Sequence, residues 1–193
     1  HYYQSAFGFQ PVAYAGLETG LTDRVSYVLR QNKITFVLTG SLTPDSEVAK
    51  HHIKHGDGVK VIALWVDDAR KAFEDTTARG ADIDFEPKSV SDENGEVVLA
   101  SIKTYGDTVH TFVERKNYNG SFLPGFKEWN PTYKPTETGL TYVDHIVGNV
   151  GWNEMDNTVD YYKDIMGFEQ LISFDDKDIS TEFLKILKKQ GIN

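Results

Sequence analysis

The strongest constraint on the fold is a nine-residue pattern that occurs once at the start of the chain and once near its end. His1–Phe9 aligns with Asp160–Phe168: both have two adjacent tyrosines, a glycine five residues later, and then a phenylalanine. Each glycine stands where a helix end needs a left-handed backbone, and each phenylalanine begins a predicted strand. We therefore expect a repeated unit in which a helix leads directly into a strand.

A third copy between these two shows the unit more fully. Val59–Val66 is a nearly continuous apolar run that predicts a strand, and Asp67 or Asp68 can cap the helix that follows it. Gly80 ends this helix, whose predicted buried face comprises Ala69, Ala72, Phe73 and Thr76. Three strands follow at Ile83–Phe85, Val97–Ile102 and Val109–Val113. Strand, helix and three strands make a βαβββ unit.

The beginning of the chain has the same order of elements without the first strand. After the opening helix, strands are predicted at Phe9–Ala15, Val25–Leu29 and Ile34–Leu38. Val143 starts a further copy, with a helix from about Asn157 and a strand at Phe168–Phe174. Since the first residues lack a capping residue and an initiator Met, we expect them to be the last turns of a helix whose beginning is missing.

These units predict an α+β fold built from repeated βαβββ modules, with open, cup-shaped mixed sheets. Residues 1–116 would form an N-terminal domain of two modules that serves as a non-catalytic scaffold. Residues 117–138, with several prolines, read as an interdomain connector. Residues 139–193 would begin a C-terminal domain that is incomplete in this sequence.

Composition excludes several classes of function. Twenty basic and twenty-nine acidic side chains give a net charge of −9, which argues against nucleic-acid and anionic-membrane surfaces. No apolar run approaches the roughly 20 residues that span a bilayer. The chain has no cysteine, so any metal must be held by histidines and carboxylates. This composition also fits a cytoplasmic protein.

Val143–Val150 predicts a short buried strand with one histidine, His145. A strand can hold an imidazole firmly enough to bind a metal, because the sheet fixes the backbone on both sides. Such a histidine is more often a hydrogen-bonded core residue, but its place in a repeated unit favours a metal ligand. Strand alternation puts Asp144 on the face opposite His145, so we do not expect it to be a second ligand. Val147 would lie on the same face as His145 and line the floor of a pocket.

The other histidines are weaker candidates. His51 and His55 have the i, i+4 spacing of some zinc ligands, but the chain then enters the turn 56–58, so we interpret them as part of a solvated loop. His110 is expected to pack inside the N-terminal cup. In the middle copy Val61 takes the position of the candidate ligand, so that copy lacks a metal-binding side chain.

Four segments together resemble the 4-hydroxyphenylpyruvate dioxygenases, a family of the vicinal oxygen chelate superfamily. Arg115–Phe126 is similar to their interdomain segment, Asp144–Val150 to their first iron-ligand strand, Ile172–Asp176 follows at the expected place, and His55–Lys60 resembles the lead into their second module. The resemblance extends to Phe183. Hydroxymandelate synthase, a close relative that acts on the same substrate, shares it.

The resemblance implies a fold of the glyoxalase and dihydroxybiphenyl dioxygenase type and an iron(II) enzyme. Its metal would be bound by two histidines and one glutamate on one face, which leaves the other positions for substrate and dioxygen. The reaction would convert 4-hydroxyphenylpyruvate and O2 to homogentisate and CO2, in tyrosine and phenylalanine catabolism. Only His145 of these ligands maps onto this sequence, so we expect the chain alone to be inactive. We also expect a homo-oligomer.

Two other classes of function remain open from the sequence. One is a non-catalytic protein of the same architecture that binds a small organic molecule without metal. The other is a metal-dependent isomerase or lyase of the glyoxalase type. In addition, Leu184–Gly191 has the pattern of a helix end where the family continues its strand, so we expect that residues are missing between Phe183 and Leu184.

Overall fold

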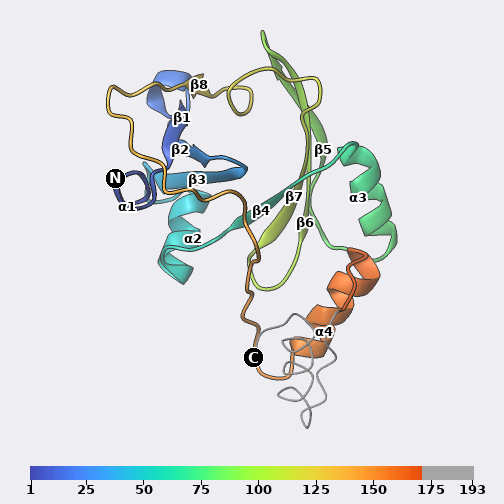
Figure 1. The fold of residues 1–193 in the computed structure, drawn as a ribbon. Helices are drawn as coiled ribbons and strands as arrows, with labels where there is room; N and C mark the ends of the chain where they lie inside the picture. The colour runs from blue at the N-terminus through green and yellow to red at the C-terminus, as the bar shows by residue number, and fades with distance from the viewer. Residues whose placement is uncertain (171–193) are drawn as a thin grey trace. The chain divides into compact units, whose positions relative to one another are not determined.

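A computed structural model of the protein describes residues 1–170 (Figure 1). Its first element is α1 (Tyr2–Phe7), which ends at Gly8 with the backbone in the left-handed region, φ 73°. The Gly8 N–H donates to the Gln4 carbonyl and the Phe9 N–H to the Tyr3 carbonyl, each over 3.1 Å. The predicted helix end and its glycine cap are confirmed.

The first sheet is antiparallel and has the strand order β3-β2-β1-β8. Its strands are β1 (Gln10–Ala15), β2 (Arg24–Gln31), β3 (Ile34–Ser41) and β8 (Lys127–Glu128), with a short 3-10 turn, η1 (Leu17–Thr19), after β1. Phe9, Leu29 and Ile34 are buried together, and Tyr3 of α1 and Phe36 pack against them. The helix that precedes this small sheet therefore contributes Tyr3 to its hydrophobic core.

The structure corrects the interpretation of His51 and His55 as loop residues. They lie on α2 (Glu47–His55), which begins at Ser46, whose hydroxyl accepts a hydrogen bond from the Ala49 N–H over 3.0 Å. Ala49 is the one buried residue of this helix. The sequence interpretation relied on the turn at residues 56–58 and did not use Ser46, whose side chain caps the start of this helix.

The second sheet has the complete βαβββ order. Its elements are β4 (Val61–Trp65), α3 (Ala69–Ala78), β5 (Ile83–Asp92), β6 (Gly95–Lys103) and β7 (Val109–Glu114). The strand order is β4-β7-β6-β5, and β4 runs parallel to β7. Asp68 caps α3 by accepting from the Lys71 N–H, and Ala69, Phe73 and Thr76 are buried, as predicted. Figure 1 shows α3 along one side of this sheet.

These elements confirm the predicted α+β class with βαβββ modules. Both sheets of the described residues are open and do not close into a barrel. No helix within residues 1–170 is long and apolar enough to cross a lipid bilayer.

The predicted connector, residues 117–138, packs along the first sheet. Its strand β8 pairs with β1, and the Trp129 N–H next to it donates to the Val12 carbonyl over 3.1 Å. Farther on, the Gln10 side chain donates to the Pro135 carbonyl over 2.6 Å. The connector is thus fixed by hydrogen bonds to the N-terminal sheet over most of its length.

The chain divides into two compact units, residues 1–149 and 150–193. The second contains α4 (Met155–Asp160) and a π-helical turn, η2 (Tyr161–Ile165). Here the Gly167 N–H donates to the Lys163 carbonyl and the Phe168 N–H to the Tyr162 carbonyl, and Gly167 has φ 74°. The same bonds close α1, so the repeat found in the sequence is confirmed in three dimensions.

The predicted domain boundaries at residues 116 and 138 stay predictions. The prediction of a strand at Phe168–Phe174 falls mostly beyond residue 170, and the expected break between Phe183 and Leu184 lies entirely outside the described residues.

Candidate metal-binding segment

The segment Val143–Val150 has no regular secondary structure and is not the buried strand that the sequence predicted. None of its residues pairs with a strand of the described chain, and the side chains of Val143, Ile146 and Val147 are exposed. A strand requires a neighbouring backbone to take up its N–H and C=O groups, and residues 1–170 supply none here. The predicted buried strand is therefore not present among the described residues.

His145 is exposed, with 76% of its side-chain surface accessible. Its Nδ1 lies 2.7 Å from Oδ2 of Asp144. The prediction that Asp144 points away from His145 is therefore wrong, since without sheet pairing the two side chains need not alternate. A carboxylate only accepts, so this contact requires a proton on Nδ1, and in the neutral ring Nε2 then keeps its lone pair. This is the tautomer that binds a metal through Nε2 while a carboxylate holds the other nitrogen.

The chain is held on both sides of His145. Before it, the Lys33 N–H donates to the Thr141 carbonyl over 2.9 Å. After it, the Gly148 backbone runs against Tyr105 of the β6–β7 turn; a Cβ at Gly148 would lie 2.4 Å from the tyrosine hydroxyl. The candidate ligand thus lies between a hydrogen bond to the first module and a close backbone contact with Tyr105 of the second.

The described residues offer one metal ligand at this position. No set of three His, Cys, Asp or Glu side chains within residues 1–170 converges on a common point. A neutral imidazole suits iron, and Asp144 gives it the orienting partner that metal-bound histidines use. The chemistry of His145 therefore fits one position of an iron site, and the further ligands must come from elsewhere.

His51 and His55 do not form a comparable site, although they share one face of α2 with ring centroids 4.6 Å apart. His55 Nε2 lies 2.7 Å from Asp107 Oδ2, and Lys54 Nζ lies 2.5 Å from the same oxygen. Hydrogen bonds from Lys54 and His55 hold the pKa of Asp107 well below its usual range. The nearby ammonium groups, including that of Lys60, disfavour a bound cation.

His110 lies on β7 and is buried, with 3% of its surface exposed, as expected of a side chain that packs inside the N-terminal module. Burial lowers the pKa of its imidazole. Val61, the position that corresponds to His145 in the middle copy, lies on β4 opposite Val109 and is about half exposed.

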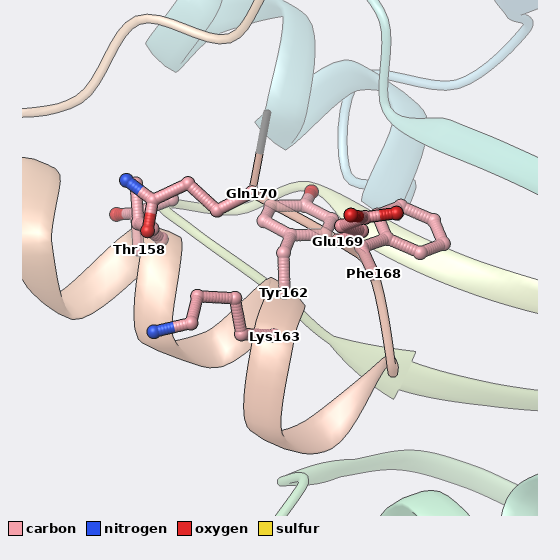
Figure 2. A pocket seen from close by; sticks show the side chains of 7 residues that line it. Thr158, Tyr162, Lys163, Phe168, Glu169 and Gln170 are labelled. Atoms are coloured by element: carbon pink, nitrogen blue, oxygen red, sulfur yellow. The ribbon is translucent and has the colours of Figure 1, made fainter. Parts of the chain in front are cut away.

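A hollow that the sequence did not indicate lies in the second unit (Figure 2). It has a volume of about 210 Å³ and is lined by Thr158, Val159, Tyr162, Lys163, Phe168, Glu169 and Gln170. The rings of Tyr162 and Phe168 stack with centroids 5.6 Å apart. These are the residues of the repeated helix cap, so this hollow belongs to the packing of the repeat. Neither His145 nor Val147 lines it.

Comparison with known proteins identifies the family. The family described as "Hydroxyphenylpyruvate dioxygenase, HPPD, N-terminal" matches residues 3–124, which include both sheets except for the short edge strand β8. The chain belongs to the hydroxyphenylpyruvate dioxygenase family. The predicted resemblance is confirmed for these residues. The match ends at residue 124, within the connector, and does not include His145.

Relatives of known name extend the comparison beyond residue 124. The chain is 41% identical over 191 residues to 4-hydroxyphenylpyruvate dioxygenase of Yarrowia lipolytica and 44% identical over 188 residues to that of Xenopus tropicalis. Each alignment covers 94% of this chain and 48% of the relative. The chain thus spans about half the length of the curated hydroxyphenylpyruvate dioxygenases that it matches.

Solved structures confirm the fold. A triple mutant of 4-hydroxymandelate synthase from Streptomyces coelicolor matches with a TM-score of 0.74 and 27% identity, covering 90% of this chain and 49% of the synthase. The identity to the named hydroxyphenylpyruvate dioxygenases is distinctly higher. Neither comparison assigns a role to His145 or Val147, which stay predicted site residues.

Proposed function

We propose that the full-length protein is an iron(II)-dependent 4-hydroxyphenylpyruvate dioxygenase, which converts 4-hydroxyphenylpyruvate and O2 to homogentisate and CO2. The observation that carries the proposal is the 41–44% identity to relatives of that name over 94% of this chain. The reaction belongs to the catabolism of tyrosine and phenylalanine. A cytoplasmic homo-oligomer remains the expectation from the sequence.

In this proposal His145 supplies one iron ligand through Nε2. Asp144 accepts a hydrogen bond from the Nδ1–H group, which fixes the ring orientation and makes Nε2 a stronger electron-pair donor to the metal. The iron, when bound by three protein groups, supplies open positions for the 2-oxo acid and for dioxygen. Val147, two residues beyond the ligand, would contact the substrate.

The N-terminal modules act in this proposal as a scaffold. Two observations support this role: both sheets bury a hydrophobic core, and residues 1–170 contain no group of three His, Cys, Asp or Glu side chains that could hold a metal. Leu140 and Thr141, just before the His145 segment, are hydrogen-bonded to the turn between β2 and β3, so the scaffold sets where that segment begins.

The proposal is tested by oxygen uptake of the iron-loaded full-length protein with 4-hydroxyphenylpyruvate, together with product analysis. We expect oxygen uptake coupled to CO2 release, with homogentisate as the product. Substrate binding without turnover would instead support a metal-independent binding protein, and isomerisation without oxygen uptake would support a glyoxalase-type enzyme.

The second candidate is hydroxymandelate synthase, favoured by the match to the Streptomyces coelicolor enzyme. It uses the same two substrates, so oxygen uptake does not separate the two. The product does: hydroxymandelate in place of homogentisate would establish this candidate.

A further inference from the structure

Gln31 is the largest buried polar side chain of the first sheet, with 1% of its surface exposed. It is the last residue of β2 and precedes the tight turn into β3. Its Nε2 donates to the Phe7 carbonyl at the end of α1. Its Oε1 accepts from the Leu140 N–H over 2.9 Å and lies 3.4 Å from Thr138 Oγ1. One amide therefore joins the opening helix, the first sheet and the end of the connector.

The two residues after Gln31 also bind the chain just beyond the connector. Asn32 Nδ2 donates to the Leu140 carbonyl over 2.6 Å, and the Lys33 N–H donates to the Thr141 carbonyl over 2.9 Å. We call residues 31–33 the hairpin tip. Three consecutive residues of the hairpin tip thus bind Leu140 and Thr141, two consecutive residues just beyond the connector.

This contact lies close to the candidate iron ligand. His145 is the fourth residue after Thr141, so the two are at most about 14 Å apart when the chain is fully extended. Residues 142–150 pair with no strand of the described chain. The hairpin tip is therefore the ordered attachment from which the ligand segment starts, and a shift at Leu140 would be passed on to His145.

The chemistry of Gln31 favours a positioning function. A buried amide is unfavourable unless its donor and acceptor are both paired, and here each has a partner on a different segment. Such a group permits only the arrangement in which all partners are in place. An apolar side chain of similar size would fill the space without fixing Leu140.

We propose that Gln31 is a positioning residue for iron binding, acting through Leu140 and Thr141 to set the start of the His145 segment. The inference rests on the proposed function, because it takes His145 as an iron ligand. It adds that a residue of the N-terminal sheet, remote in sequence from the ligand, determines how well that ligand is placed.

The test uses the full-length protein and the variants Gln31→Leu and Asn32→Gly. Asn32 has φ 50°, so glycine keeps the turn while removing the side-chain bond to Leu140, and this exposed site does not endanger folding. We expect faster hydrogen exchange of the Leu140 amide in Gln31→Leu, by about tenfold for a lost hydrogen bond. We expect iron affinity to fall by about tenfold in Gln31→Leu and by a smaller factor in Asn32→Gly.

Ser101→Ala is the matched control. Ser101 is fully buried in the second sheet, where its hydroxyl bonds to the His110 carbonyl and lies 3.2 Å from Thr111 Oγ1. Its loss removes buried hydrogen bonds without touching residues 138–141. We expect it to lower the melting temperature while leaving iron affinity and Leu140 exchange unchanged.

The outcomes separate this inference from the proposed function. If the wild-type protein does not bind iron, the proposed function fails and the positioning function fails with it. If wild-type protein binds iron and Gln31→Leu binds it equally well despite faster Leu140 exchange, only the positioning function is overturned. If Gln31→Leu and Ser101→Ala lose iron affinity to the same extent for a given drop in melting temperature, Gln31 acts only through stability. The inference is then likewise overturned.

Discussion

At the scale of single residues, the structure places a carboxylate beside the candidate ligand where strand alternation predicted none. His145 and Asp144 are adjacent in sequence, and their side chains meet because the segment is not held in a pleated sheet. The pair is exposed, so it contributes little to folding stability. Its value would lie in fixing the tautomer of His145.

We expect Asp144→Ala in the full-length protein to weaken iron binding by about 10- to 100-fold, the range for loss of a carboxylate that orients a metal-bound histidine. The measurement is an iron titration of the metal-free protein. Asp57→Ala is the control, since Asp57 makes a comparable exposed contact of 3.3 Å with His52 rather than with His145. Equal iron affinity in the Asp144 variant and the wild type would contradict the assigned role.

Because His110 is buried, we expect the folding stability to depend on pH. Burial lowers the pKa of His110 in the folded protein, so below the unfolded value of about 6.5 the unfolded chain binds a proton that the native state does not. Stability is therefore fully present above about pH 6.5 and is lost as the pH falls, by up to about 1.4 kcal/mol per pH unit for this group.

The measurement is the free energy of unfolding by urea between about pH 8 and pH 5. The variant His110→Gln should lack this component of the slope, whereas His52→Gln, at an exposed position, should keep it. The same slope in wild type and His110→Gln would show that the buried imidazole is not responsible.

At the scale of elements, the helix caps were the most predictable features and the pairings of extended segments the least. Gly8, Gly167 and Asp68 could be assigned from sequence, because a left-handed cap and an N-cap are local requirements. The pairing of β8 with β1 could not, because a two-residue strand carries no periodicity and depends on its neighbour. The strand predicted around His145 likewise depends on a neighbouring strand, and residues 1–170 contain no strand that pairs with it.

Gly8 offers a test of the cap and of the connector together. Gly8 and Gly20 both have positive φ, but a Cβ at Gly8 would lie 2.3 Å from the Thr136 carbonyl oxygen, whereas nothing lies within 4 Å of one at Gly20. We expect Gly20→Ala to cost about 1–2 kcal/mol of folding free energy from backbone strain. Gly8→Ala should cost a further 1–3 kcal/mol or so from the clash with the connector.

Urea unfolding of the two variants measures this difference. Equal losses of stability would mean that the connector does not pack against the end of α1 in solution.

At the scale of the whole molecule, the sequence predicted the modules and the family, while the site stays largely a prediction. The modules could be predicted from the repeated Tyr-Tyr and Gly-Phe pattern and from the apolar strands, because helix caps and strands depend on local sequence. A metal site depends on side chains that converge from distant strands. Residues 1–170 contain one predicted ligand and no set of three, so the geometry of the complete site cannot follow from this part of the chain.

A consequence is that the 193-residue chain alone should bind iron(II) weakly and show no dioxygenase activity, since His145 is the one predicted ligand among residues 1–170 and a single imidazole leaves most coordination positions to water. Equilibrium dialysis against iron(II) measures this directly. Stoichiometric binding at micromolar iron would contradict the account and would require ligands that we have not identified.

The most direct measurement of the central claim is the iron content of the purified full-length protein and of its His145→Ala variant. Since the side chain is largely exposed, we expect the variant to fold with an unchanged melting temperature and to retain less than about a tenth of the wild-type iron. His52→Ala, another exposed histidine, should keep all of it. Stoichiometric iron in folded His145→Ala would contradict the claim that this imidazole holds the metal.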